Sequence, residues 1–309
     1  MRNATEVSAA INPFLRIEDP GAPTRRGFLK GSLCSLLLPA LSAPWLVSCG
    51  EDSYAPPPTP RLTSVNNFRD VAGANDEGAY RTSSGRKLQR GVIYRSNALD
   101  PSPTDLATLN TLHIVADYDL RTPGEIALLP DIPPAGATWL NINIIGTSNN
   151  PAPALTSADQ AISDMEFSYT EFVTDSGVRG RLAEVFQKLA TTSGGSQVYH
   201  CNGGKDRTGW VTTILLSVLG VPQSAIVQDY MLTNVYSAAS IQASWQQMAN
   251  ADGQAFADIY YPIWIADQRY LDAALNQVTA SYGTMANYIN QGLGLSSSVQ
   301  TLLCDKLLT

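Results

Sequence analysis

Residues 198–209 read VYHCNGGKDRTG, and this stretch indicates how the chain around it is arranged. The apolar pair before His200 is typical of the end of a strand, and residues 207–219 form a strongly apolar helical pattern that Gly220 closes. A tight connection from a strand to a helix turns successive backbone N–H groups toward one point. The sequence therefore predicts an anion-binding loop at 200–209.

The residue types in this loop fit a nucleophile and a dianionic phosphate group. Gly203 and Gly204 let the backbone approach the anion closely. The same N–H groups stabilise a thiolate, which makes Cys201 the candidate nucleophile. Arg207 can hold two phosphoryl oxygens with its planar fork, and Thr208 is a candidate donor to the departing thiolate. The predicted substrate-binding residues are Asn202, Gly203, Gly204, Lys205 and Arg207.

These roles predict a two-step hydrolysis of phosphate esters. Cys201 attacks phosphorus and forms a cysteinyl-phosphate, which water then hydrolyses without a metal or another cofactor. Two residues are candidates for the general acid: Asp206 inside the loop, and Asp119 at the end of a central strand, where active-site groups tend to lie. Asp119 has an alternative role as a carboxylate that braces the loop by pairing with an Arg. We expect His200 to order the loop through hydrogen bonds rather than to act as a base.

Four further side chains bear on the site. Lys205 adds a second positive charge at the mouth of the loop, and we expect it to contact substrate rather than to be a solvated surface Lys. The Lys-Asp pair before Arg207 makes inositol phosphates and phosphoinositide headgroups candidate substrates. We expect Arg69 and Arg95 to be structural rather than extra phosphate contacts. Cys304 lies in an apolar helical pattern and is predicted to be a buried thiol.

Strands and helices alternate before and around the loop. Strands are predicted at 91–95, 114–120, 138–145 and 198–200, with helices at 103–112, from Thr122 with its capping box to Glu125, at 158–173, 179–192 and 207–219, and a loop at 147–157. Periodic apolar residues predict further helices at 223–234, 237–249, 265–281, 284–292 and 296–308. The expected fold class is α/β, a mostly parallel central sheet flanked by helices, with a helical C-terminal section at 223–309.

The loop sequence resembles that of the atypical bacterial secreted tyrosine and phosphoinositide phosphatases, which share HCxxGKDRTG. The resemblance covers most of residues 62–309 and includes the segments 67–73, 94–99, 119–121 and 270–274. It implies a protein-tyrosine-phosphatase-like fold and activity on phosphotyrosine, and several members of the family also accept phosphoserine, phosphothreonine and phosphoinositides. Typical tyrosine phosphatases place the acid Asp on a separate mobile loop. The corresponding segment here, 145–150, holds no carboxylate.

The first residues read as a targeting segment. Residues 24–30 are TRRGFLK, which matches a twin-arginine export signal, and an apolar stretch at 31–47 leads to LVSC at 46–49, which resembles a lipoprotein-processing box. We therefore expect a signal peptide at 1–48, lipidation of Cys49, a Pro-rich tether at 49–61 and a phosphatase domain at 62–309. The protein would be exported by the twin-arginine route and lipid-anchored in the cell envelope, on its periplasmic or extracellular face. The alternative is a disordered N-terminus that happens to contain an Arg pair.

Composition limits the partners. The net charge is −7 and the pI about 4.8, which argues against nucleic acid. The expected partners are a phosphorylated protein, phosphoinositide or inositol phosphate as substrate, inorganic phosphate as product, and a membrane through the lipid anchor. Two rival functions are a catalytically silent lipoprotein that binds phosphorylated ligands and a rhodanese-like sulfurtransferase. The intact Cys201 and Arg207 argue against the first, and the Lys-Asp-Arg triplet argues against the second.

Overall fold

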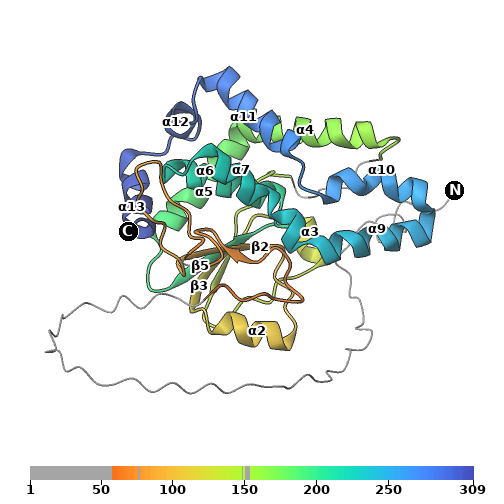
Figure 1. Ribbon diagram of the computed structural model, residues 1–309, viewed down its shortest axis with the longest axis horizontal. Coiled ribbons are helices and arrows are strands. Elements are labelled where there is room, and N and C mark those ends of the chain that lie inside the picture. The colour runs from red at the N-terminus through yellow and green to blue at the C-terminus, as the bar shows by residue number, and fades with distance from the viewer. Residues whose placement is uncertain (1–57, 76, 148, 150–153) are drawn as a thin grey trace, which may run out of the picture. The chain divides into compact units, whose positions relative to one another are not determined.

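A five-stranded sheet forms the centre of the protein. The computed structural model describes residues 58–75, 77–147, 149 and 154–309 (Figure 1). The strands are β1 (Arg69–Asp70), β2 (Ile93–Ser96), β3 (Ile114–Asp119), β4 (Thr138–Asn141) and β5 (Ser196–His200), in the order β1-β2-β5-β3-β4. β1 is antiparallel to β2, and every other neighbouring pair is parallel. The predicted mostly parallel α/β sheet is confirmed.

The register of the strands brings three of their carboxyl ends together. Ser96 at the end of β2 and Asp119 at the end of β3 both lie beside His200, the last residue of β5. The pairing continues for one step beyond the strands, because the N–H of Leu120 donates to the carbonyl of His200 at 2.8 Å. The predicted anion loop therefore starts at the middle of the sheet edge, where active-site groups of parallel sheets usually lie.

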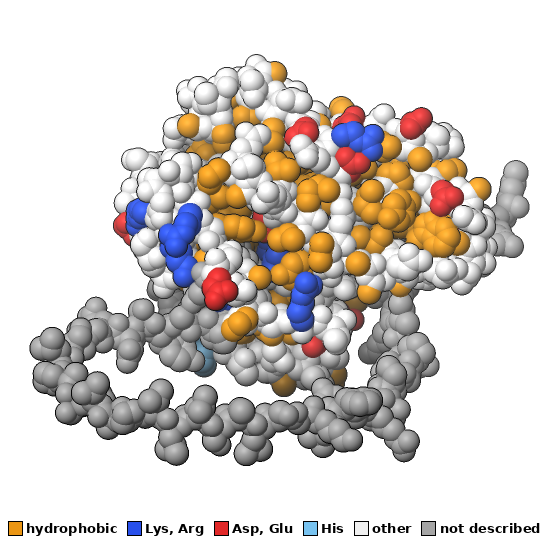
Figure 2. Space-filling model, viewed as in Figure 1, with side chains coloured by type: hydrophobic (Ala, Val, Ile, Leu, Met, Phe, Trp, Pro, Cys, Tyr) orange, Lys and Arg blue, Asp and Glu red, His pale blue; other side chains and the backbone are white. Residues whose placement is uncertain are grey.

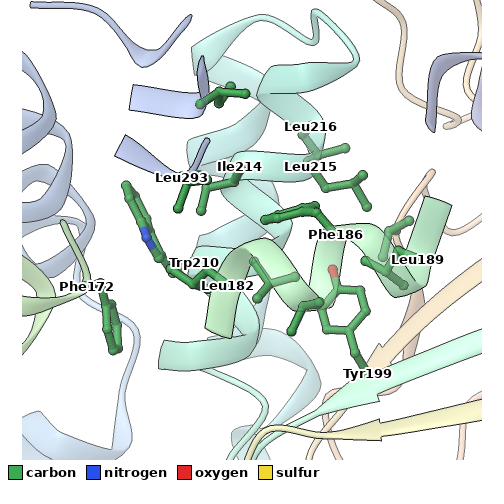
Figure 3. Packing of buried hydrophobic residues seen from close by; sticks show 14 of the residues in the cluster. Phe172, Leu182, Phe186, Leu189, Tyr199, Trp210, Ile214, Leu215, Leu216 and Leu293 are labelled. Carbon is green, nitrogen blue, oxygen red and sulfur yellow. The ribbon is translucent and has the colours of Figure 1, made fainter. Parts of the chain in front are cut away.

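Helices cover both faces of the sheet. The helix α2 (Pro103–Asn110) lies on one face, and α5 (Ser176–Thr191) and α6 (Asp206–Val218) lie on the other (Figure 1). Ten of the thirteen residues of α6 are buried, so this helix lies within the core. Figure 3 shows how Trp210 and Leu215 of α6 meet Leu182 and Phe186 of α5 above Tyr199 of the sheet. Burying this apolar surface stabilises the element that carries the loop.

The C-terminal section is helical, as predicted. Its elements are α7 (Gln223–Met231), α8 (Thr233–Tyr236), α9 (Ala238–Asp252), α10 (Gln254–Trp264), α11 (Gln268–Tyr282), α12 (Met285–Asn287), the π-helix η1 (Tyr288–Gly292) and α13 (Ser297–Leu307). The two remaining helices are α3 (Pro123–Leu128) and α4 (Ala158–Thr174). α10 was not among the helices predicted from periodic apolar residues, and the sequence has Gly253 before it and Pro262 within it. Gly253 ends α9 with a φ of 96°, and Pro262 lies in the last turn of α10.

One predicted strand is shorter than expected. β4 ends at Asn141 rather than at 145, although the N–H groups of Ile142 and Ile144 still donate to the carbonyls of Asp119 and Leu120. Both isoleucines are buried, which explains the apolar pattern that predicted a longer strand. The polar segment that follows is a loop where it is described.

A smaller apolar cluster joins the start of α4 to α9 and α10, built on Leu155, Ala161, Met248, Ala257 and Tyr260. Figure 2 shows hydrophobic side chains gathered on the surface over α9 and α10, with few charges between them. Of the helices in the described ranges, none has both the length and the apolar character to cross a bilayer. The predicted signal peptide at 1–48, Cys49 and most of the tether at 49–61 lie outside the described residues.

Candidate active site

The loop from β5 to α6 requires glycine at one position. Gly204 has a φ of 64°, and a Cβ built there would lie 2.4 Å from the carbonyl oxygen of Ser96. Gly203 has open space where its Cβ would be. Gly204 is therefore fixed by both conformation and packing. α6 begins at Asp206, one residue earlier than the predicted start.

Buried ionic groups hold the loop from the side of the sheet. Arg95 and Asn67 each donate to the carbonyl of Gly204 at 2.7 Å. Arg69 and Arg95 are both paired with Asp229 of α7, at 3.2 and 3.0 Å, and all three charges are buried. These contacts agree with the structural role predicted for Arg69 and Arg95.

The backbone N–H groups of the loop stay available. Within the described residues, none of the N–H groups of 202–206 donates to a backbone carbonyl. The carbonyl of Gly204 in the same loop accepts hydrogen bonds from Arg95 and Asn67 instead. The loop thus has the free donors that an anion nest needs.

Cys201 is buried at the start of this loop, with 2% of its surface exposed. It interacts electrostatically with three cations, Arg95, Lys205 and Arg207, so a thiolate here faces positive charge. Nδ1 of His200 lies 3.5 Å from the Cys201 carbonyl oxygen. The predicted nucleophile therefore lies close to the two loop cations predicted with it, Lys205 and Arg207, and also to Arg95.

Arg207 is held by a carboxylate that sequence reasoning did not assign to the site. Its two terminal nitrogens donate to the two oxygens of Glu125 at 2.7 and 2.6 Å. Glu125 also completes the predicted capping box with Thr122 at the start of α3. Burial alone would lower the pKa of Arg207, but Glu125 outweighs burial and raises that pKa above its usual range. One sequence feature could have indicated this role of Glu125: it is a carboxylate in the first turn of the helix that follows a central strand.

Lys205 does not reach the solvent. Its ammonium donates to the carbonyls of Ile263 and Ile265 at 2.7 and 2.8 Å and lies 3.5 Å from Asp206. Burial lowers its pKa, although Asp206 opposes this effect. Lys205 therefore joins the loop to the connection between α10 and α11, and its contact with substrate stays a prediction.

A sequence model of the tyrosine phosphatase family matches residues 60–309. The chain belongs to this family. It is similar to a protein of Cupriavidus necator named as a tyrosine-protein phosphatase, with 31% identity over 264 residues, which cover 81% of this chain and 94% of that protein. It is also similar to the triple specificity protein phosphatase PtpB of Mycobacterium tuberculosis, with 26% identity over 273 residues, 77% of this chain and 94% of PtpB. A tyrosine-protein phosphatase of Nostoc commune is 29% identical over 154 residues, 49% of this chain and 51% of the relative.

The chain is thus a phosphoric monoester hydrolase of the protein-tyrosine-phosphatase type, and its two candidate acids differ in their surroundings. Asp119 is fully buried, and Arg121 donates to both of its oxygens at 2.9 Å. Asp206 keeps 32% of its side chain exposed and accepts a hydrogen bond from Tyr169 at 2.9 Å. In this phosphatase Asp119 has the contacts of a bracing carboxylate, and Asp206 has access to solvent.

Thr208 lies in the first turn of α6. Its hydroxyl is buried and has no hydrogen-bond partner within the described part of the phosphatase. An unsatisfied buried hydroxyl costs free energy unless a ligand or a reacting group uses it. The hydroxyl of Thr208 therefore remains available to a thiolate.

Proposed function

We propose that this phosphatase hydrolyses phosphate monoesters through a cysteinyl-phosphate on Cys201. The observation that carries the proposal is a buried thiol at the start of a loop whose N–H groups stay free and whose neighbours include three cations. Phosphotyrosine is the main substrate class that we propose, as in the family. Phosphoserine, phosphothreonine and phosphoinositides are further classes, and the triple specificity named for the Mycobacterium tuberculosis relative favours such a range.

In the first step, the Cys201 thiolate attacks phosphorus and the ester oxygen leaves. The N–H groups of 202–206 and Arg207 bind the three non-bridging oxygens, whose charge grows in the transition state. Glu125 holds the guanidinium of Arg207 in one orientation, so less conformational freedom is lost when phosphate binds. The general acid protonates the leaving oxygen in the first step. In the second step, water attacks phosphorus, the resulting carboxylate takes its proton, and the P–S bond breaks to give inorganic phosphate. Thr208 donates a hydrogen bond to the departing thiolate.

We assign the general acid to Asp206. Its partial exposure and its place inside the loop support this role, whereas the paired and fully buried oxygens of Asp119 favour bracing. Loss of the acid slows a poor leaving group far more than a good one. The test compares Asp206→Asn and Asp119→Asn on an alkyl phosphate and on an aryl phosphate with an acidic phenol. Equal losses on both substrates in both variants would contradict both assignments.

The nucleophile is tested with wild type and Cys201→Ser on an aryl phosphate and on a panel of phosphotyrosine peptides, phosphoserine peptides, phosphoinositides and inositol polyphosphates. We expect hydrolysis by wild type alone, with a quenched reaction showing one added phosphate on the peptide that contains Cys201. An inert wild type that binds these ligands would favour the silent binding lipoprotein. Transfer of sulfur from thiosulfate to cyanide would favour the sulfurtransferase.

We also propose export by the twin-arginine route and anchoring through lipid on Cys49. The support is the sequence TRRGFLK at 24–30 followed by LVSC at 46–49. Metabolic labelling with a fatty acid should mark wild type and not Cys49→Ala. Replacement of Arg25 and Arg26 by Lys should keep the unprocessed chain in the cytoplasm, and processing that continues would count against this route.

A further inference from the structure

A second cluster of ionisable side chains lies behind the loop, on the sheet face covered by α2. Val198 on this face packs against Leu109 of α2, and His200 follows two residues later on the same strand. Nε2 of His200 lies 3.1 Å from Asp117 and 3.2 Å from Asp131. All three side chains are buried, and the reaction proposed above uses neither Asp117 nor Asp131.

The carboxylates of the cluster differ in how well they are satisfied. Arg121 neutralises Asp119, to which it donates through its side chain and its backbone. Asp131 forms an ion pair with Arg121 at 2.7 Å, and it accepts hydrogen bonds from the N–H of Leu99 at 3.0 Å and from Trp139 at 3.1 Å. Asp117, in contrast, has no aligned hydrogen-bond donor among the described residues, and Nε2 of His200 is its nearest positive group.

Counting charges shows that the ionised cluster carries an excess of two negative charges. Asp117, Asp119 and Asp131 carry three negative charges, and Arg121 carries one positive charge. Burying unbalanced carboxylates costs several kcal/mol each, and burial raises the pKa of Asp117, although His200 opposes this effect. A proton held between Asp117 and His200, or a bound cation, offsets part of this excess. A divalent cation is disfavoured because the guanidinium of Arg121 already lies 2.7 Å from Asp131.

The two ring nitrogens of His200 face different groups, and each favours a proton. Nε2 lies 3.1 Å from Asp117 and 3.2 Å from Asp131 without an aligned hydrogen bond, and both carboxylates attract a positive charge on the ring. Nδ1 faces the Cys201 carbonyl oxygen at 3.5 Å, which would repel a bare nitrogen lone pair. A neutral imidazole can satisfy only one of these two environments, whereas an imidazolium satisfies both.

We propose that Asp117 and Asp131 are positioning residues that hold His200 doubly protonated, so that its Nδ1–H fixes the Cys201 carbonyl and its charge lies behind the nucleophile. This inference rests on the proposed function of Cys201. Asp117 gives the cleaner test, because Asp131 also binds Arg121, Leu99 and Trp139.

The electrostatics agree with this geometry. Burial alone would lower the pKa of His200, but Asp131 and Asp117 outweigh burial and raise that pKa well above its usual range. The charged groups that face the ring are Asp117 and Asp119 from β3, Arg121 after it, and Asp131 from the connection between α3 and β4. From β2 the neighbour is Ser96, which carries no charge.

The protonation of His200 is measured directly by NMR on the full chain labelled with ¹⁵N-histidine. The chain has two His, so His113→Gln assigns the signals. We expect both nitrogens of His200 to carry protons at pH 7.5 in wild type, and one proton to be lost there in Asp117→Asn. A neutral His200 in wild type at that pH, or one bound metal per chain by elemental analysis, would overturn the proposal.

The effect on the nucleophile is measured by alkylation of Cys201 with iodoacetamide, read by mass spectrometry of its peptide across pH. The rate of alkylation rises with pH as the thiol of Cys201 ionises, and its midpoint typically moves by about one pH unit when a nearby charge is lost. At a pH below the wild-type midpoint, Asp117→Asn and Asp131→Asn should therefore react about tenfold more slowly than wild type. Asp105→Asn is the control, since Asp105 is buried but binds Thr63 and Ser64 beside α2 instead. An unchanged midpoint in folded Asp117→Asn would also overturn the proposal.

Neither readout depends on turnover, which keeps this inference separable from the proposed function. A wild type that hydrolyses no phosphate ester but holds a doubly protonated His200 would contradict the function and leave the role of the two carboxylates supported. If Asp131→Asn fails to fold, Asp117→Asn decides, and the wild-type NMR spectrum decides without any carboxylate variant.

Discussion

Glu125 illustrates how much one residue contributes beyond its local role. It lies 82 positions before Arg207 and holds that guanidinium with two hydrogen bonds. We expect Glu125→Gln to lower kcat/KM for a phosphotyrosine peptide by about a hundredfold, because a clamp that is misplaced by about 1 Å loses that much. Steady-state kinetics measure this loss. Glu171→Gln, at an exposed position on α4, should leave kcat/KM unchanged, and an equally small effect at Glu125 would count against the clamp.

The two loop glycines provide a matched pair for stability. A Cβ on Gly204 would meet the carbonyl of Ser96 in a backbone conformation that other residues resist, whereas a Cβ on Gly203 meets nothing within 4 Å. Gly204→Ala should therefore reduce the free energy of unfolding by about 2–4 kcal/mol, and Gly203→Ala by less than about 1 kcal/mol. Urea denaturation measures both values. Equal losses would mean that the clash is relieved elsewhere.

For single residues, the sequence predicted the features that depend on neighbouring positions in the chain. The loop residues at 200–209 lie in one short segment, so pattern and spacing were enough to predict a site there. Glu125 was recognised as a capping residue, but its use by Arg207 depends on the packing of α3 beside the loop. Lys205 was expected at the loop mouth, and only the arrangement of the C-terminal helices shows why it is buried. Asp117 looked like part of a strand, and nothing in the strand pattern indicates that it faces His200.

Asp229 links three elements, since it pairs with Arg69 of β1 and Arg95 of β2 from its place on α7. Removing one partner from a buried ion pair typically costs 3–5 kcal/mol, so Asp229→Asn should lose about that much stability at pH 7. Burial would raise the pKa of Asp229, but Arg69 and Arg95 outweigh it and lower that pKa below 3.8.

The stabilisation by the two ion pairs of Asp229 therefore depends on pH in a defined way. Its contribution is present above about pH 4 and is lost as the pH falls through the lowered folded-state pKa. Urea midpoints of wild type and Asp229→Asn at pH 7, 4 and 2.5 should converge toward the acid end. A constant difference across these values would show that the charge of Asp229 is not what stabilises the fold.

Lys205 ties the loop to the connection between α10 and α11. Lys205→Met keeps most of the volume but removes both hydrogen bonds to the carbonyls of Ile263 and Ile265. We expect faster amide hydrogen exchange in 254–268, since local opening then breaks fewer contacts, and no change in α5. Protection that stays at the wild-type level in 254–268 would contradict this link.

The elements that the sequence missed have identifiable reasons. β1 has only two residues, too few for any periodic pattern, and it exists because Arg69 and Asp70 pair with Arg95 and Tyr94. α10 contains Pro262, which ordinarily ends a helix, and α10 does end two residues later, at Trp264. The carbonyl of Pro262 accepts from Tyr270 at 3.0 Å. The longer elements, such as α6, were predicted well because many buried positions repeat in each of them.

In the molecule as a whole, one main apolar cluster extends from Val71 to Leu307. A substitution that removes buried apolar side-chain atoms far from the loop should therefore lower the stability of the entire folded part. Leu303 and Leu302 of α13 form the test pair, with 0% and 44% of their surfaces exposed. Leu303→Ala should cost about 2–5 kcal/mol and lower Tm by several degrees, and Leu302→Ala about 0.5 kcal/mol or less. Separate melting transitions for α13 and the sheet would contradict a single cooperative unit.

The contacts of Lys205 suggest that binding at the loop can be followed through the fluorescence of a neighbouring tryptophan. The two carbonyls that it binds belong to Ile263 and Ile265, and Trp264 stands between them. An anion that draws Lys205 toward the loop must loosen one of these bonds and shift the surroundings of that indole. Occupancy of the site should then be visible in tryptophan emission during a titration with vanadate or inorganic phosphate. Trp264→Phe should remove the change, which would make an unlabelled binding assay available for inhibitors.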